Sequence, residues 1–254
     1  MDLWAQRESE GLADKLAMIY VESPANPTND LFDCQMCRQL ANQLGTEEKP
    51  VHLVVDNTYL GPIWQKPLDH GADLVVYSAT KYIGGHSDVI AGAVMGNIAL
   101  INRIKGMRTF MGNMASPLTG WLLLRSLETL KLRMDRQAEN ASIVATFLQT
   151  HDAVEQVHYL GFTEQMGERQ HAIFQRQCLS PGAMVSFSVK GGEAEAVRFL
   201  NHLQLAKLAV SLCGTETLAQ HPASITHSGM CPEQKEALCI TENTIRISVV
   251  LVHP

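Results

Sequence analysis

The stretch Tyr77-Ser78-Ala79-Thr80-Lys81-Tyr82-Ile83-Gly84-Gly85-His86-Ser87-Asp88 decides how the rest of the chain is interpreted. The apolar run Leu74–Tyr77 leads into it and predicts a buried strand that ends just before the lysine. Because burial of an unpaired ammonium group is costly, a lysine at this place suggests an amine that is used covalently, as in a Schiff base. The hydroxyl groups of Ser78 and Thr80 are suited to an anion such as a phosphate. We therefore interpret Lys81 as the anchor of pyridoxal phosphate (PLP), with an ordinary surface lysine as the alternative.

Composition and charge exclude several classes of protein. The chain has 254 residues, enough for one large or two modest domains, and its net charge of -6 comes without a basic run. Nucleic acid is therefore not expected as a partner. No apolar stretch has the length of a membrane span, so no membrane association is expected. The start, Met1-Asp2-Leu3-Trp4, lacks the basic and apolar regions of a secretory signal, which favours the cytoplasm.

The cysteines are expected to be reduced thiols, because a chain of this length needs no disulfide framework. They are Cys34, Cys37, Cys178, Cys213, Cys231 and Cys239. The spacing Cys34-x-x-Cys37 occurs in redox and zinc sites, but no second Cys or His pair stands at zinc-finger spacing. We therefore expect no metal site and interpret these two residues as small core residues on one helix.

The first half of the chain alternates short strands with helices or loops, which indicates an α/β architecture. A helix is predicted from about Asp30 to Leu44, capped by Asn29 or Asp30 and ended by Gly45. Its expected buried stripe is Phe32, Met36, Leu40 and Leu44, widened by Cys37 and Ala41. Strands are predicted at Met18–Val21, Val51–Asp56, Leu74–Tyr77 and Ile90–Met95, with a short helical piece near Lys66–His70.

From Pro117 the pattern changes to one long amphipathic helix, or two joined end to end, that reaches about Thr150. Ser116 can cap this helix, and Pro117 fits its first turn. Beyond it we expect a helix at about Glu193–Leu203 and strands at Ala153–Tyr159, Ala183–Val189, Ala209–Leu212 and Thr244–Val250. The chain is therefore predicted to form two domains, a cofactor-binding one over residues 1–118 and, over residues 119–254, the linking helix with a smaller α/β domain.

Polar loops follow the first three predicted strands and place Asn26, Asp56 and the Ser78–Lys81 group beyond their carboxyl ends. Ligands of open α/β sheets bind at that edge. The carboxylate of Asp56 suits the pyridine nitrogen of the cofactor, and Asn26 can donate a hydrogen bond to its phenolic oxygen. The alternatives are a helix cap or turn residue for Asp56 and an ordinary turn residue for Asn26.

Arg246 lies within the alternating strand pattern Thr244–Val250. An arginine on a mostly apolar strand suits bidentate capture of an amino-acid carboxylate. The alternative is a surface-facing arginine on the polar side of the strand. His221 and His227 are six positions apart, which matches no usual metal spacing, and we interpret them as loop-stabilising residues.

Five motifs in collinear order, spread over nearly the whole chain, together resemble the Cys/Met-metabolism (transsulfuration) family of PLP-dependent enzymes. They are Glu22-Ser23-Pro24-Ala25-Asn26-Pro27, Val55-Asp56-Asn57-Thr58-Tyr59, Ser78-Ala79-Thr80-Lys81-Tyr82, Gly85-His86-Ser87-Asp88-Val89 and His221-Pro222-Ala223-Ser224-Ile225-Thr226-His227. The resemblance implies an α/β fold of the aspartate-aminotransferase-like type I class, with a mostly parallel sheet in the large domain. It also implies a homo-oligomer, either a dimer or a tetramer.

The resemblance gives each candidate residue a role. Lys81 would bind PLP covalently and act as general base, while Asp56 would pair with the pyridine nitrogen and Asn26 with the phenolic oxygen. Ser78 and Thr80 would hold the phosphate. Arg246 would bind the carboxylate of a small sulfur-containing amino acid, and Ser211 would orient that carboxylate or the lysine.

Within the family, the segment Gly214–Pro222 is most similar to methionine γ-lyases and predicts γ-elimination to a 2-oxo acid, ammonia and a thiol. The alternatives are γ-replacement, as in cystathionine γ-synthase or O-acylhomoserine sulfhydrylase, and a truncated, non-catalytic remnant. Chains of the family begin upstream of Met1 and continue beyond Pro254. The phosphate loop, the ring-stacking tyrosine, the arm to the neighbouring subunit and a final helix are therefore expected to be missing here. Cys213 stands where glycine is common.

Overall fold

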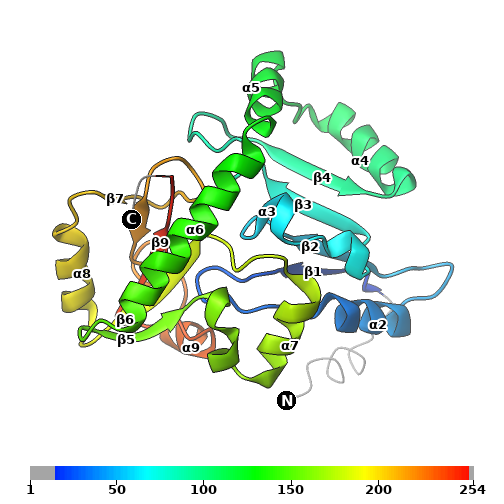
Figure 1. The fold of residues 1–254 in the computed structure, drawn as a ribbon. Coiled ribbons are helices and arrows are strands. Elements are labelled where there is room, and N and C mark those ends of the chain that lie inside the picture. Colours follow the sequence, from blue (N-terminus) through cyan, green and yellow to red (C-terminus); the bar gives the residue numbers. More distant parts are fainter. Residues whose placement is uncertain (1–14, 252–254) are drawn as a thin grey trace.

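The first sheet consists of three parallel strands and a fourth that runs the other way (Figure 1). The computed structural model describes residues 15–251, so the predicted absence of a signal at Met1–Trp4 lies outside the described residues. The strand order is β1 (Met18–Glu22), β2 (His52–Asp56), β3 (Leu74–Ser78) and β4 (Gly92–Gly96), with β4 antiparallel to β3. The predicted strands are confirmed with small shifts at their ends. Because β1, β2 and β3 are parallel, their carboxyl ends meet at one edge, as expected.

Helix α2 (Cys34–Leu44) packs on one face of this sheet through small residues. It begins later than predicted, because Asp33 caps it by accepting from the N–H groups of Gln35 and Met36. Gly45 ends the helix as predicted. Cys34, Cys37 and Ala41 form its buried face, which confirms the two cysteines as core residues.

The predicted stripe on α2 is confirmed at Cys37 and Ala41, which are buried, and wrong at the bulky positions before Leu44. Phe32 precedes the helix and is 45% exposed, and Met36 and Leu40 are 49% and 43% exposed. The sheet is contacted instead by the small side chains one position away, which let the helix backbone approach Leu53 and Val55 closely. Burial also raises the pKa of the Cys34 thiol to about 12, so this thiol stays protonated and unreactive.

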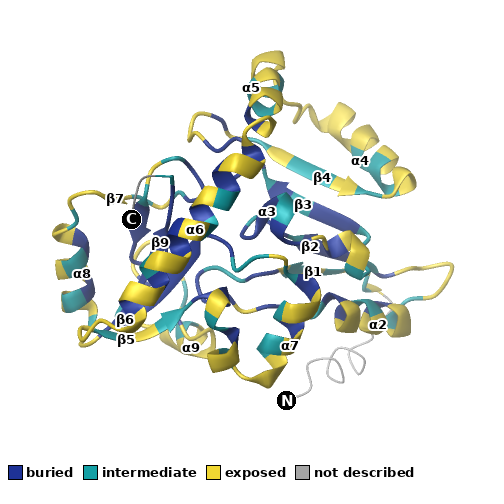
Figure 2. Ribbon diagram, in the orientation of Figure 1, coloured by how far each residue is buried: buried dark blue, intermediate teal, exposed yellow. Residues whose placement is uncertain are grey.

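The predicted long helix is two helices, α5 (Pro117–Leu127) and α6 (Leu130–Gln149). Ser116 caps α5 by accepting from the N–H of Thr119, as predicted. Helix α4 (Ile98–Met111) was not predicted and has no buried residue, and much of α4 and α5 is exposed in Figure 2. The short pieces before it are α3 (Gly61–Trp64) and η2 (Pro67–His70). None of the helices within residues 15–251 has both the length and the apolar character needed to cross a membrane.

The second sheet has the order β5-β6-β9-β8-β7, and only its β7–β8 pair is parallel. Its strands are β5 (Val154–His158), β6 (Met184–Val189), β7 (Lys207–Leu208), β8 (Leu218–Gln220) and β9 (Thr244–Ser248). The predicted strand at Ala209–Leu212 is wrong, because the carbonyls of Val210 and Ser211 accept hydrogen bonds from Arg246. Helix α8 (Glu193–Asn201) was predicted, whereas η3 (Leu160–Met166), α7 (Glu168–Gln177) and α9 (Pro232–Ala237) were not.

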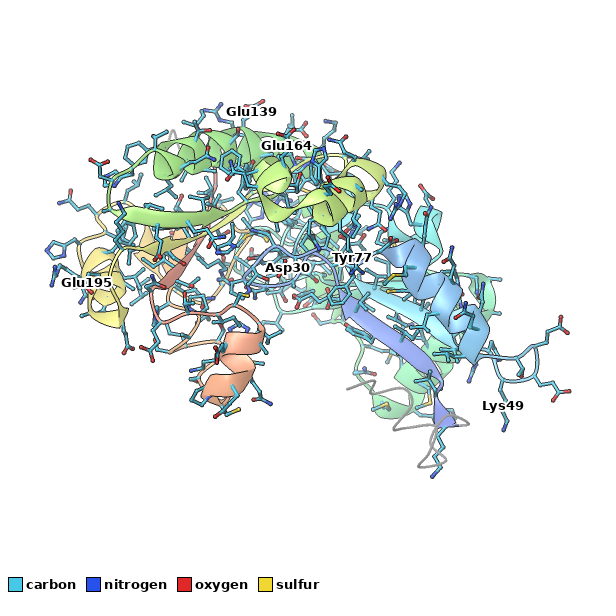
Figure 3. All side chains as sticks on the ribbon, turned by 90° about the horizontal axis from the view of Figure 1, so that it is seen from below. Asp30, Lys49, Tyr77, Glu139, Glu164 and Glu195 are labelled. Atoms are coloured by element: carbon cyan, nitrogen blue, oxygen red, sulfur yellow. The ribbon has the colours of Figure 1, made fainter. Side chains whose placement is uncertain are left out.

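One hydrophobic core joins the second sheet to the loops of the first. It combines Tyr59, Trp64 and Tyr82 from the first half with Met134 of α6 and Phe187 of β6. Figure 1 shows α6 running diagonally between the two sheets. In Figure 3, Glu195 of α8 and Lys49 of the α2–β2 loop mark opposite ends of the molecule. The α/β class is confirmed, and the domain boundary near residue 118 stays a prediction.

Candidate cofactor site

The chain turns sharply after β3, and this turn presents Lys81. The Lys81 N–H donates to the carbonyl of Ser78 at 3.0 Å, and the Lys81 carbonyl accepts from the N–H of Gly85 at 2.7 Å. Gly85 has a φ of 69°, and a Cβ atom there would lie 2.0 Å from Nη1 of Arg133. Both the backbone conformation and the available space therefore require glycine at this position.

Arg133 of α6 supports the loop over residues 79–88, here called the lysine loop, from the other half of the chain. It is 5% exposed and donates from Nη1 to the carbonyl of Tyr82 at 2.9 Å. It also donates to the carbonyl of Ser126 at 3.0 Å and to Oγ1 of Thr129 at 3.2 Å. Sequence reasoning missed this residue. The available signal was an arginine directly beside the apolar Met134 in the helix that was predicted to be amphipathic.

The side-chain amine of Lys81 is the free nucleophile of the loop. Lys81 is half-buried, and its amine has no hydrogen-bond or ion-pair partner among the residues that the structure describes. Burial lowers the pKa of this amine, Cys213 raises it and Arg246 lowers it again. A lowered pKa leaves more of the amine neutral and able to attack a carbonyl group.

Asp56 is held in place at the carboxyl end of β2. Its Oδ1 accepts from the N–H of Thr58 at 3.0 Å, and its Oδ2 accepts from the hydroxyl of Tyr20 at 3.1 Å. The hydroxyl of Thr58 in turn accepts from the N–H of Ser78 at 2.8 Å. Asp56 is therefore linked to the start of the lysine loop through one residue. Tyr20 was not predicted as a site residue, although it lies two positions before Glu22 on the same strand face.

Arg246 is buried next to the loop that follows β1. It is 1% exposed, so the alternative of a surface-facing arginine is wrong. Its Nη1 donates to Oδ1 of Asn26 at 3.2 Å, and its Nη2 donates to the carbonyls of Val210 and Ser211 at 2.7 and 3.1 Å. Ser211 thus takes part through its backbone. The Nε atom has no hydrogen-bond partner, and no ion pair within the described part of the chain includes Arg246.

The two predicted phosphate-binding hydroxyls differ in this structure. The hydroxyl of Thr80 is engaged by Ala91, donating to its carbonyl at 3.3 Å and accepting from its N–H at 3.0 Å. The hydroxyl of Ser78 has no partner within residues 15–251, so it is the readier donor. Any phosphate contact by Thr80 would have to share or replace the bond to Ala91.

The remaining predicted features of this region are structural. Cys213 has a φ of 64°, is 1% exposed, and donates from its N–H to Oγ of Ser248 at 2.7 Å. The ring of His221 bonds Oγ of Ser224 at 2.7 Å and the carbonyl of Glu242 at 2.6 Å, which confirms it as a loop-stabilising residue. His227 bonds Oγ1 of Thr226 at 2.9 Å in the same loop.

The side chains of this site are chemically suited to hold PLP. A half-buried amine can form the covalent link, a positioned carboxylate can face a ring nitrogen, and Ser78 can donate to a phosphate. The amide nitrogen of Asn26 has no partner among the described residues and can donate to the phenolic oxygen, because the amide oxygen faces Arg246. The unpartnered Nε of buried Arg246 also suits an anionic ligand.

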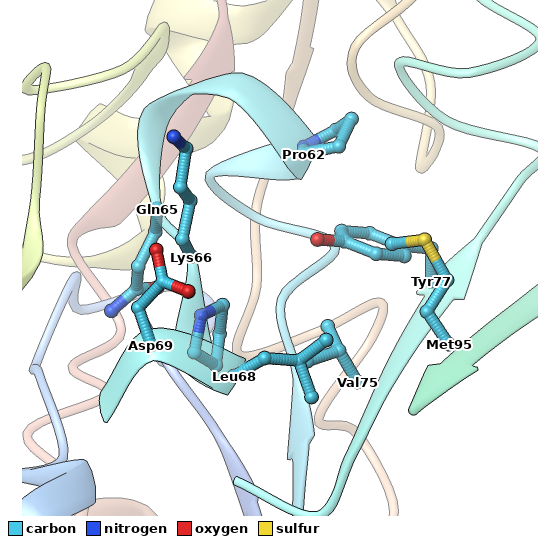
Figure 4. Close-up of a pocket in the computed structure, with 9 residues that line it drawn as sticks. Pro62, Gln65, Lys66, Leu68, Asp69, Val75, Tyr77 and Met95 are labelled. Carbon is cyan, nitrogen blue, oxygen red and sulfur yellow. The ribbon is translucent and has the colours of Figure 1, made fainter. Parts of the chain in front are cut away.

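A cavity of about 260 Å³ lies on the other side of β3 and is not this site. Figure 4 shows Val75, Tyr77 and Met95 on one side of it and Lys66 and Asp69 on another. Alternation along β3 sends Val76 and Ser78 to the opposite face of the sheet, on the side of Asp56. Among the described residues, no group of three or more His, Cys, Asp or Glu side chains is placed to hold a metal.

Comparison with known proteins gives consistent matches. A family model described as Cys/Met metabolism PLP-dependent enzyme matches residues 5–253. The chain is 44% identical to L-methionine gamma-lyase of Pseudomonas putida over 236 residues, which cover 92% of this chain and 57% of the relative. It is 40% identical to cystathionine gamma-lyase of Sus scrofa, covering 92% and 56% of the two chains. A solved cystathionine gamma synthase from Xanthomonas oryzae pv. oryzae has a TM-score of 0.86 and 39% identity, with 96% of this chain and 61% of that chain covered.

Proposed function

Since the chain belongs to the Cys/Met metabolism family of PLP-dependent enzymes, we propose that it serves carbon–sulfur bond cleavage in a sulfur-containing amino acid. The proposed reaction is γ-elimination of methionine or a related substrate to a 2-oxo acid, ammonia and a thiol. The chain spans little more than half the length of the curated relatives that it matches, with coverages of 57% and 56%. The family resemblance, the type I fold class and the PLP cofactor expected from the sequence are confirmed by these matches.

PLP supplies an electron-accepting ring that stabilises negative charge at the α-carbon of an amino acid. The chain's own residues would hold this group and move protons beside it. Lys81 would provide the covalent link and, once released, would remove the α-proton as general base, helped by its lowered pKa. Asp56 would keep the ring nitrogen protonated, Asn26 would donate to the phenolic oxygen, and Ser78 with Thr80 would bind the phosphate.

The observation that carries the proposal is the state of Arg246. It is a cation that is 1% exposed, its hydrogen bonds go to neutral acceptors, and one of its donors is unpartnered among the described residues. Burial takes the guanidinium group out of water and thereby lowers its pKa. An amino-acid carboxylate would supply the missing negative charge, and Ser211 would help to set its orientation.

Two alternatives have specific support. The likeness to a cystathionine gamma synthase at a TM-score of 0.86 keeps γ-replacement open as the reaction. The partial coverage of the relatives keeps a non-catalytic role open for this chain. Two incubations of the cofactor-loaded protein separate them, one with methionine and one with an O-acylhomoserine and a thiol. Release of a 2-oxo acid and ammonia supports elimination, reaction only with an O-acylhomoserine and a thiol supports replacement, and neither supports a non-catalytic role.

We also propose that the protein forms a homo-oligomer. Phe110 and Met111 of α4 are 92% and 68% exposed, and Leu118 and Trp121 of α5 are 64% and 59% exposed. Large apolar side chains that are exposed on two consecutive helices suit a protein–protein contact. Sedimentation of the wild type and of Phe110→Glu tests this, because a charge in the contact should shift the population to smaller species.

A cytoplasmic location is proposed as well, because all six cysteines are free thiols.

The first experiment concerns Lys81 itself. The purified chain is mixed with PLP, its visible absorbance is recorded, and the complex is reduced with borohydride for peptide mass spectrometry. We expect a yellow complex whose reduced cofactor maps to Lys81, and no such adduct in Lys81→Ala. Lys66→Ala is the matched control and should keep the adduct. Absorbance that persists in Lys81→Ala would show that the anchor is wrong.

A further inference from the structure

Two acidic residues end the neighbouring strands β1 and β2 side by side. Glu22 and Asp56 are direct partners in the parallel register of these strands. Partners in a parallel pair point to the same face of the sheet, and adjacent strands are only about 4.8 Å apart. The register therefore places the two side chains next to each other, and neighbouring carboxylates repel unless one of them keeps a proton.

The surrounding hydrogen bonds decide which carboxyl group keeps the proton. Asp56 accepts two bonds, from the N–H of Thr58 at 3.0 Å and from the hydroxyl of Tyr20 at 3.1 Å. Among the described residues, the backbone N–H of Asn26 is the one donor that interacts with the carboxyl group of Glu22. Bonds donated to a carboxylate stabilise its charged form, so these two bonds favour the negative charge on Asp56 over a negative charge on Glu22.

The groups around Glu22 also favour Glu22, rather than Asp56, as the group that keeps the proton. Loss of hydration at the carboxyl group raises the pKa of Glu22 to about 7, with Asp56 as the second cause, although other atoms of the residue are exposed. The other titratable groups that interact with Glu22 are Tyr20 on the same strand and Tyr59 in the loop after β2. Neither is a cation that would offset the repulsion from Asp56.

We propose that Glu22 is a positioning residue of the cofactor site that acts through Asp56, the two carboxyl groups sharing one proton. This inference deepens the proposed function and rests on it for the role of Asp56 toward PLP. The pair would then present one negative charge rather than two to the ring nitrogen of a bound cofactor. The shared proton is held mainly by Glu22, so both oxygens of Asp56 keep their acceptor character.

The test begins with the chain alone, so that it does not depend on cofactor binding. Glutamate and aspartate are labelled with ¹³C at their carboxyl carbons, and the resonances are followed against pH. The Glu22 signal, assigned by its loss in Glu22→Gln, is expected to titrate well above 4.5 and near 7. In Asp56→Asn its midpoint should fall toward the ordinary value, because the repelling charge is gone. A Glu22 midpoint near 4.5 that Asp56→Asn leaves unchanged would overturn the proposal.

Tyr20→Phe is a second variant, which tests the shared proton without removing either carboxyl group. It removes one donor from Asp56, so the proton should move toward Asp56 and the Glu22 midpoint should fall. PLP binding is then measured by absorbance against pH in the wild type, in Glu22→Gln and in the exposed control Glu48→Gln. We expect a change of affinity near the Glu22 midpoint in the wild type and in Glu48→Gln, and none in Glu22→Gln. Identical pH profiles in all three would contradict a role toward the cofactor, whereas absence of any PLP complex would contradict the proposed function instead.

Discussion

Arg246 and Asn26 are 220 positions apart in the chain, yet Nη1 of Arg246 lies 3.2 Å from Oδ1 of Asn26. The bond joins the middle of β9 in the second sheet to the loop after β1 in the first. Ser186 of β6 makes a second link to this loop, donating from Oγ to the carbonyl of Pro27 at 2.7 Å. The proposed substrate-binding cation and a proposed cofactor-binding amide are thus fixed relative to each other by contacts between the two sheets.

This relationship predicts the effect of Arg246→Met. The variant removes the fork that would bind the substrate carboxylate, and the acceptor Asn26 loses its donor. Truncation of one member of a buried charge pair costs about 2 to 5 kcal/mol of binding, so affinity for an unreactive amino-acid analogue should fall by that amount. Calorimetric titration of the PLP-loaded protein measures it. Arg198→Met, at an exposed arginine of α8, should leave the affinity unchanged. Equal affinity in Arg246→Met would remove this residue from the substrate site.

Sequence reasoning reached the residues that follow strands directly. Lys81, Asp56 and Asn26 could be placed because a parallel sheet brings the ends of its strands to one edge. Arg133 and Tyr20 could not, because their roles come from contacts made across the fold, such as the bond of Arg133 to the carbonyl of Tyr82. Local patterns do not contain that information.

The helix α2 shows a second limit of the sequence. The spacing of Phe32, Met36 and Leu40 indicated a buried stripe, whereas the sheet contacts Cys34 and Cys37. Hydrophobicity predicts that some face of a helix is buried, but the space available against a sheet selects small side chains over large ones. The exposure of these bulky residues is compatible with a stable fold, because the surfaces of folded proteins contain many apolar atoms.

Arg133→Ala is expected to loosen the lysine loop. It leaves the carbonyl of Tyr82 without its donor, whereas the carbonyl of Ser126 still accepts from the N–H of Thr129, and an unsatisfied buried group costs about 1 to 3 kcal/mol. The free energy of unfolding in urea should therefore fall by about 1 to 3 kcal/mol. Arg136→Ala on the same helix is the control, because Arg136 pairs with Glu139 at the surface and should change stability by less than about 1 kcal/mol. Similar losses in both variants would contradict the role of Arg133.

Gly85→Ala should be more damaging than its size suggests. A left-handed conformation costs a residue with a Cβ atom about 1 to 2 kcal/mol, and the added methyl group would also displace the guanidinium of Arg133. Thermal unfolding should show a clear fall in Tm, and less PLP should attach to Lys81. Gly106→Ala is the matched control. It lies inside α4 with open space around it, so alanine should stabilise the helix by up to about 1 kcal/mol. A neutral Gly85→Ala would show that the loop tolerates another conformation.

Glu22 makes stability depend on pH in a direction opposite to that of most carboxyl groups. Its pKa is raised from 4.5 to about 7 in the folded chain, so between these values the folded state binds more protons than the unfolded state. The stabilising contribution is therefore fully present below 4.5 and is lost as the pH rises through about 7.

Urea unfolding of the wild type and of Glu22→Gln between about pH 5 and pH 8 measures this loss. Relative to Glu22→Gln, which cannot ionise, the wild type should become steadily less stable across this range. The curve for Glu48→Gln should stay parallel to that of the wild type, because this residue is exposed on the α2–β2 loop. In Asp56→Asn the dependence should weaken, since the charge that repels the ionised Glu22 is removed. If the wild type instead gained stability relative to Glu22→Gln as the pH rises, Glu22 would be an ordinary ionised glutamate. The proposal that Glu22 and Asp56 share one proton would then be wrong.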